Sequence, residues 1–205
     1  MDDASIDITQ LPRIPYLRYE DADGEARELW DADRPVSAPG LDATRDVHPQ
    51  TLTLLRHPRL AEVYQPFVRY LMQSDCLPAR HRELAVLRTA WNCGSDTQWH
   101  HHVQIGLACG LTEQDVDRVP AGPTASWETP DRAVLRACDE LHEWCRLGDE
   151  TWCALAESYD TQQMLELIVL VGNYRTLAYI QGSVGIKPFA GWSPDIPGNR
   201  FLFRP

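Results

Sequence analysis

Two side chains that can move protons, Glu83 and His102, lie in consecutive helical stretches of the sequence. Gly94 lies between these stretches, and a glycine typically ends a helix and begins a tight turn. Helices joined in this way form an antiparallel hairpin, which brings an early residue of the first helix near a late residue of the second. A carboxylate and an imidazole that meet in an apolar pocket shift each other's pKa and can act as general acid and base. We therefore predict that Glu83 and His102 are catalytic.

Each of these residues also has a structural explanation. Glu83 lies in the first turn of its helix, where a carboxylate complements the helix dipole. His102 shares a helix face with Trp99 and Gly106, so it points inward and could be a hydrogen-bonded core histidine. In the catalytic interpretation, Trp91 and Trp99 line the site and exclude water.

Four further residues are candidates for substrate binding. Arg88 and Arg175 can each hold a substrate anion, since a guanidinium binds a carboxylate through two hydrogen bonds. The structural alternative is that both arginines form ion pairs within the protein. Asn173 and Tyr174 lie in the last long helical stretch, where they either line the site or pack in the core.

Three consecutive histidines, His100, His101 and His102, suggest a metal site at first sight. Adjacent residues point about 100° apart around a helix, whereas metal ligands on one helix need a spacing of three or four. We therefore predict no metal within one chain. The alternative is that one of these histidines completes a three-histidine site across a threefold axis.

The six cysteines contain no Cys-x-x-Cys pair, so the sequence lacks the usual signature of a redox dithiol or a zinc knuckle. We expect thiols, most of them buried. The string Ser95-Asp96-Thr97-Gln98 instead predicts a capping box, in which Ser95 and Gln98 satisfy open backbone donors of the next helix. We include both residues among the predicted substrate-binding residues.

Helix signals recur from His48 onward. Pro58 and Pro78 are placed as first-turn prolines, and Thr112, Asp149 and Asp160 as helix caps. The predicted helices include about 79–91 before Gly94, 96–109 before Gly110, and one opened by Thr129-Pro130-Asp131 that ends near Gly148. No stretch alternates with period two, which predicts an all-α fold.

We expect a single domain over residues 1–205. Its ends differ from its middle: residues 1–45 form an irregular N-terminal strap with a short helix around Glu25–Trp30, and residues 187–205 form an aromatic C-terminal tail. The tail folds back on its own core or docks on a neighbouring subunit.

Composition narrows the classes of partner. The 205 residues are 43% hydrophobic and 24% charged, with a formal net charge of −11. Such an acidic chain repels phosphate backbones and anionic lipid, so we predict no nucleic-acid or membrane partner. The acidic N-terminus does not resemble a signal peptide, and no apolar run approaches the ~20 residues of a membrane helix. We expect a soluble cytoplasmic protein.

Three motifs together resemble the carboxymuconolactone decarboxylase family, which includes the alkylhydroperoxidase D proteins. They are the string from Arg82 to Trp91, the pair Trp99-x-x-His102, and Gly110-Leu111-Thr112. The resemblance extends from about residue 48 to 186. It implies an alkylhydroperoxidase D-like helical bundle, a Glu83–His102 acid/base pair, and a homo-oligomer, either a trimer or a hexamer built from trimers.

The chain departs from the family pattern where redox chemistry would occur. Alkylhydroperoxidase D proteins carry a Cys-x-x-Cys pair at the positions of Ser95 and Gln98. Decarboxylase members often have Tyr-Glu-Trp where this chain has Thr97-Gln98-Trp99, and many relatives have histidine in place of Asn173.

The resemblance and these departures predict a cofactor-independent, non-redox lyase or isomerase that acts on a small carboxylated or lactone-like metabolite. One alternative is a divergent thiol peroxidase that uses Cys93. The other is a catalytically silent ligand-binding or scaffold subunit of the same fold.

Overall fold

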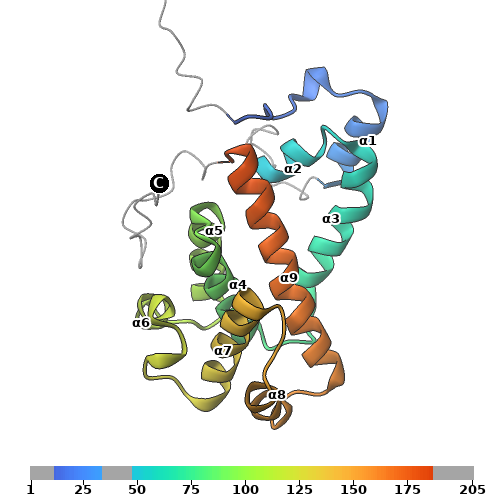
Figure 1. Cartoon of the computed structure of the whole chain (residues 1–205). Helices are drawn as coiled ribbons and strands as arrows, with labels where there is room; N and C mark the ends of the chain where they lie inside the picture. The colour runs from blue at the N-terminus through green and yellow to red at the C-terminus, as the bar shows by residue number, and fades with distance from the viewer. Residues whose placement is uncertain (1–11, 34–47, 187–205) are drawn as a thin grey trace, which may run out of the picture. The chain divides into compact units, whose positions relative to one another are not determined.

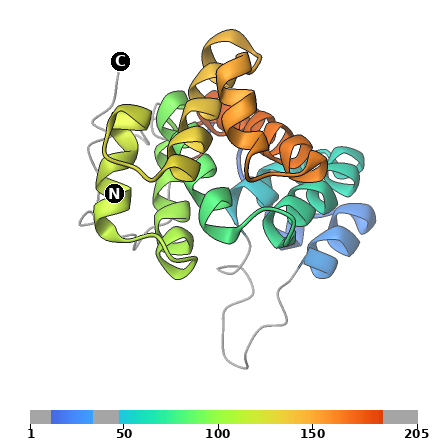
Figure 2. The same cartoon turned by 90° about the horizontal axis from the view of Figure 1, so that it is seen from below.

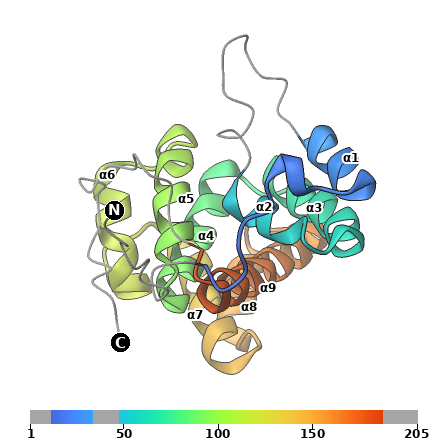
Figure 3. The ribbon, with the colours of Figure 1, turned by 90° about the horizontal axis from the view of Figure 1, so that it is seen from above.

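The structure, a computed structural model, describes residues 12–33 and 48–186. Within these ranges it contains nine α-helices, two short 3-10 helices and no strand (Figures 1, 2 and 3), which confirms the all-α prediction. None of the helices in these ranges is long and apolar enough to cross a membrane. About half of the predicted strap and the whole predicted tail lie outside the described residues.

The chain divides into two compact units, which we describe separately. Among the described residues, the first unit takes those up to Tyr70 together with 181–186. It contains a 3-10 helix, η2 (Tyr19–Asp21), then α1 (Gly24–Asp33), α2 (Pro49–Leu54), most of α3 (Pro58–Gln73) and the end of α9 (Thr161–Val184). The side-chain amide of Gln181 donates to Gln50 over 2.6 Å and ties the end of α9 to α2.

The second unit, residues 71–180 of the described chain, carries the predicted site. Its elements are α4 (Ala79–Cys93), α5 (Asp96–Ala108), α6 (Glu113–Arg118), the 3-10 helix η3 (Val119–Thr124), α7 (Thr129–Trp144), α8 (Asp149–Ala156) and most of α9. Helix α4 packs on both α5 and α7. Consequently residues 82–87 of α4 are all buried.

Several helix ends are where the sequence predicts them. Gly94 ends α4 and Gly110 follows α5, both with positive φ, the conformation that glycine adopts without strain. Thr112 forms a capping box with Asp115 at the start of α6. Asp160 and Gln163 exchange hydrogen bonds of 2.9 and 3.0 Å at the start of α9, so Asp160 is a cap as expected.

Three local predictions were wrong. The Ser95 hydroxyl accepts from the Gln98 backbone N–H, but the Gln98 side chain does not complete the box, because it donates to the carbonyl of Tyr174 instead. Asp149 is the first residue of α8, and Gly148 is the N-cap. Pro78 is the N-cap of α4 rather than a first-turn residue.

The core of the second unit forms where α4, α5 and α7 meet. It contains buried leucines, valines and aromatic residues from these helices, including Leu84, Leu87, Trp99, Val103 and Leu135. Burial of apolar surface of this kind is the main favourable contribution to folding. The cluster therefore holds α5 against α4, the two helices that carry the predicted acid and base.

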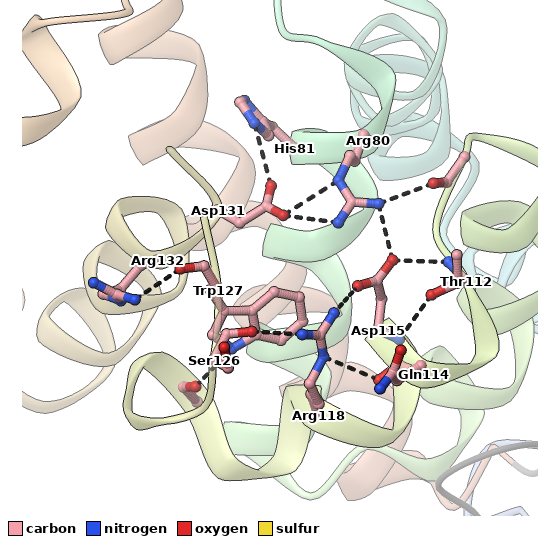
Figure 4. Close-up of polar contacts among 12 residues, drawn as sticks. Arg80, His81, Thr112, Gln114, Asp115, Arg118, Ser126, Trp127, Asp131 and Arg132 are labelled. Atoms are coloured by element: carbon pink, nitrogen blue, oxygen red, sulfur yellow. Dashed lines mark hydrogen bonds and ion pairs between the residues drawn. The ribbon is translucent and has the colours of Figure 1, made fainter. Parts of the chain in front are cut away.

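An ion-pair network fixes the first turn of α4 (Figure 4). Arg80 binds Asp131 of α7 over 2.7 Å and Asp115 of α6 over 3.0 Å. Burial raises the pKa of Asp115, but hydrogen bonds from Arg80, Thr112 and Arg118 outweigh it and hold the pKa below its usual value. The carboxylate is therefore ionised and anchors Arg80, just before Glu83.

Candidate active site

Glu83 of α4 and His102 of α5 meet inside the second unit. His102 Nδ1 lies 2.8 Å from Glu83 Oε2. The Glu83 side chain is fully buried, and that of His102 is only 5% exposed. The turn at Gly94 thus produces the antiparallel hairpin that the sequence predicts, and the hairpin brings the two side chains within hydrogen-bonding distance.

Gly106 permits this close approach of α5 to α4. A Cβ at this position would lie 2.8 Å from Leu111 Cδ1 and 3.7 Å from Glu83 Cβ. Gly106 is one helical turn after His102, so the two residues lie on the same face of α5. The absence of a side chain at Gly106 therefore brings the backbone below His102 close to Glu83.

Arg82, which is not among the site residues predicted from the sequence, is the second partner of Glu83. Its Nε donates to Glu83 Oε1 over 3.0 Å, and its Nη1 donates to the carbonyl of Ser74 over 3.1 Å. Burial acts to raise the pKa of Glu83, but the hydrogen bonds and charges of His102 and Arg82 outweigh burial and lower it. Glu83 is therefore ionised, with a partner on each oxygen. The only signal in the sequence is that a basic residue precedes Glu83.

The charge on Glu83 determines which nitrogen of His102 can react. An ionised carboxylate accepts hydrogen bonds only, so Nδ1 of His102 must carry the proton that it shares with Glu83. In the neutral ring, Nε2 then has a free lone pair. Nε2 makes no hydrogen bond within the described ranges. This nitrogen is therefore the one that can take a proton from a substrate and return it.

Tyr174 of α9 connects His102 to Gln98. Its ring meets the His102 ring edge to face, with the centroids 5.0 Å apart. Its backbone carbonyl accepts from Gln98 Nε2 over 2.8 Å, which fixes the orientation of that amide. Gln98 Oε1 is buried and has no hydrogen-bond partner among the residues that the structure describes. It is an acceptor that a substrate hydroxyl or N–H can satisfy.

The remaining predicted site residues lie close by or in the adjoining core. The rings of Trp91 and Trp99 pack with centroids 5.6 Å apart, and Trp99 belongs to the apolar core. Asn173 is buried beside Tyr174 in α9. Ser95 is buried and caps α5, the helix that carries His102.

The two arginines are bound within the protein to different degrees. Arg88 binds Asp139 through Nε and Nη2, at 2.6 and 2.9 Å, and its Nη1 donates to two carbonyls of η3. All three of its nitrogens are thus engaged. Arg175 donates through Nη1 to the carbonyls of Leu141 and His142 and through Nε to Tyr179, which leaves Nη2 without a partner within the described chain.

Cys93, the candidate redox thiol, lies beside His142. The distance from Cys93 Sγ to His142 Nδ1 is 4.0 Å. Burial raises the pKa of the Cys93 thiol, and the charge of Arg175 only partly offsets it. Burial and Arg175 also lower the pKa of His142. Both shifts favour the neutral thiol and the neutral imidazole over the reactive thiolate.

The other two histidines of the run have different contacts from His102. His100 Nδ1 bonds to the backbone carbonyl of Asp96 over 2.7 Å, and the His101 ring lies edge to face with that of His102. Over residues 12–33 and 48–186, no group of three His, Cys, Asp or Glu side chains is arranged to hold a metal ion.

Comparison with solved structures identifies the fold. An alkylhydroperoxidase AhpD core protein from Ralstonia eutropha, described as an uncharacterized peroxidase-related protein, matches 89% of this chain and 94% of its own, with TM-score 0.72 and 15% identity. A variant of the debrominase Bmp8 in complex with 2,3,4-tribromopyrrole matches 86% of this chain and 92% of its own, with TM-score 0.66 and 14% identity. An uncharacterized peroxidase-related protein from Silicibacter sp. matches 78% of this chain and 92% of its own, with TM-score 0.64 and 11% identity.

The chain is thus an all-α protein with the alkylhydroperoxidase D-like fold and a buried glutamate–histidine pair. Residues 58–137, which contain Glu83 and His102, match the family model described as the carboxymuconolactone decarboxylase family. No curated protein matches the sequence.

Proposed function

We propose that the protein is a cofactor-independent acid/base enzyme, a lyase or isomerase in which His102 Nε2 moves a proton to or from a substrate carbon. The observation that carries the proposal is the buried 2.8 Å contact between His102 Nδ1 and Glu83 Oε2. Glu83 holds the ring in the tautomer that leaves Nε2 basic, and its charge stabilises the imidazolium once Nε2 accepts the proton. Proton transfer of this kind contributes roughly 10²–10⁴ to a rate.

The neighbouring groups support a small oxygen-containing substrate, such as a lactone or a carboxylated metabolite. Gln98 Oε1 would accept a hydrogen bond from a substrate O–H or N–H. A substrate carboxylate needs a cation, and Arg175 is a better candidate than Arg88, because one of its nitrogens has no partner in the described chain. Trp91 and Trp99 would limit water near the reacting carbon.

Thiol chemistry at Cys93 is the second candidate, and the 4.0 Å contact with His142 favours it over the other cysteines. Two of the structural neighbours are described as peroxidase-related. The neutral state that burial favours for Cys93 argues for the acid/base proposal. Equal rates of peroxide consumption by the wild type and Cys93→Ser would remove Cys93 from consideration.

The acid/base proposal is tested by following hydrogen exchange at carbon. A panel of small lactones and carboxylated metabolites is incubated with the protein in D₂O, and NMR records loss of the C–H signal next to the carbonyl. We expect His102→Ala and Glu83→Gln to slow the exchange by roughly 10²-fold or more. His100→Ala, a change on the same helix outside the site, is the matched control and should keep the wild-type rate.

Exchange that is equally fast in His102→Ala and the wild type would overturn the assignment. Binding of panel members without any exchange would instead support the silent ligand-binding subunit.

A further inference from the structure

The partner of the Gln98 side chain determines which end of its amide is available to a ligand. Gln98 is only 3% exposed, and its Nε2 donates to the backbone carbonyl of Tyr174 over 2.8 Å. A carbonyl oxygen only accepts hydrogen bonds, so the NH₂ end of the amide must face it. The reversed amide would place two acceptor oxygens against each other. Oε1 is therefore the end that remains for another partner.

This oxygen needs a donor. Gln98 Oε1 is buried and has no hydrogen-bond partner among the residues that the structure describes. Buried acceptors in folded proteins are almost always paired, because an unpaired one costs free energy. A water molecule or a group of a ligand can provide the hydrogen bond.

Gln98 belongs to the same part of the site as the proposed base. It lies one helical turn before His102, so the two side chains share a face of α5. Both also contact Tyr174, Gln98 through its carbonyl and His102 through its ring, whose centroid is 5.0 Å from that of Tyr174. A molecule that reacts at His102 Nε2 therefore meets an acceptor at Gln98 Oε1.

Charge restricts the kind of donor. The two oxygens of Glu83 already accept from His102 and Arg82. An ammonium group at Gln98 would find this carboxylate already paired, and burial of an unpaired charge is costly. A carboxylate has no proton to donate. A neutral donor fits best, and a hydroxyl needs less room in this buried place than an amide N–H with its acyl group.

We propose that Gln98 determines the substrate class and that the enzyme acts on α-hydroxycarbonyl compounds. The carbon that loses its proton to His102 Nε2 also bears the hydroxyl that donates to Gln98 Oε1. In this step the C–H bond breaks, the proton moves to Nε2, and the electron pair is delocalised onto the neighbouring carbonyl group. Return of the proton to the same carbon gives exchange or inversion. The inference rests on the proposed acid/base function.

The test compares α-hydroxy-γ-butyrolactone with α-methoxy-γ-butyrolactone, a probe that has the same ring but no donor. NMR in D₂O records exchange at the carbon next to the carbonyl. Each rate is divided by the rate without protein, which removes the difference in intrinsic acidity. We expect the wild type to accelerate the hydroxy probe about tenfold more than the methoxy probe, the upper range for one hydrogen bond.

Gln98→Met keeps an unbranched side chain but removes the acceptor, so the two accelerations should become similar. Gln104→Met, at an exposed position on the same helix, is the matched control and should keep the wild-type preference. Circular dichroism checks that both variants are folded. The comparison of the two probes in the wild type tests the proposal even where Gln98→Met is unstable.

Calorimetric titration with the same two probes separates this proposal from the acid/base function. The wild type should bind the hydroxy probe about tenfold more tightly than the methoxy probe, and Gln98→Met should bind both alike. If this preference is found without exchange, the acid/base function fails, while Gln98 is supported as the residue that selects a hydroxylated ligand.

Equal acceleration of both probes in the wild type, lost in His102→Ala, would uphold the acid/base function and overturn the hydroxyl proposal. This is the result expected if Gln98 Oε1 binds only water. A preference for the hydroxy probe that Gln98→Met retains, or the failure of both probes to bind or exchange, also overturns it.

Discussion

At the scale of single residues, the site depends on the two hydrogen bonds that the Glu83 carboxylate accepts. One oxygen of the fully buried Glu83 side chain accepts from His102 and the other from Arg82. A buried carboxylate with two charge-assisted hydrogen bonds is held in one orientation. The imidazole is then aligned by a fixed group, so Nε2 is directed without the help of a bound substrate.

This arrangement predicts a pH-dependent contribution of Glu83 to stability. In the folded protein, the hydrogen bonds and charges of His102 and Arg82 outweigh burial and hold the pKa of Glu83 below its ordinary value. Such a group stabilises the protein fully above the unfolded pKa and loses that effect as the pH falls through the folded pKa. In Glu83→Gln the contribution is absent. We expect the wild type to exceed this variant in free energy of unfolding at pH 6, and the gap to narrow below about pH 4.5.

Urea unfolding at pH 6, 5 and 4 measures this gap, with Glu62→Gln, a change at an exposed position on α3, as the control. If the difference between the wild type and Glu83→Gln is the same at every pH, the lowered pKa of Glu83 is refuted.

At the scale of elements, local signals predict helix ends well and side-chain partners poorly. Gly94 and Thr112 act within one turn of the chain, so their roles can be recognised from neighbouring letters. Gln98 has an equally good local role in a capping box, yet its amide bonds to α9, far along the sequence. Asp139, the partner of Arg88, is also distant in sequence. A partner brought in by tertiary packing leaves no pattern in a single sequence.

The Glu83–His102 pair could be predicted because it does not depend on packing between distant parts of the chain. Both residues belong to one hairpin, whose geometry follows from two helices and a glycine turn. The position of Gly106 opposite Glu83 is a consequence of the same hairpin. Helix ends and the acid/base pair could thus be read from the sequence, whereas the second partner of Glu83 and the binding of the arginines required the packed structure.

Gly106→Ala tests how tightly α5 is packed on α4. The added methyl group would lie 2.8 Å from Leu111 Cδ1, and Leu111 is itself buried in the core. Overpacking costs about 1–3 kcal/mol, while alanine improves the helix by roughly 1 kcal/mol. We expect a net loss of about 1 kcal/mol in unfolding free energy and slower carbon exchange, since the methyl group displaces α5 next to His102.

Chemical denaturation compares this variant with Gly182→Ala, another helical glycine, where a Cβ would have nothing within 4 Å. The control should be as stable as the wild type or more so. Equal stabilisation by both substitutions would show that the α4–α5 contact is looser than the structure indicates.

At the scale of the whole molecule, the net negative charge affects how two copies approach each other and does not affect the acid/base pair. The chain has a sequence pI near 5.0, while the acid/base pair is buried beside Arg82 and away from the charged surface. The formal charge of −11 therefore does not specify a substrate. Its consequence is repulsion between copies, which any contact between them must overcome.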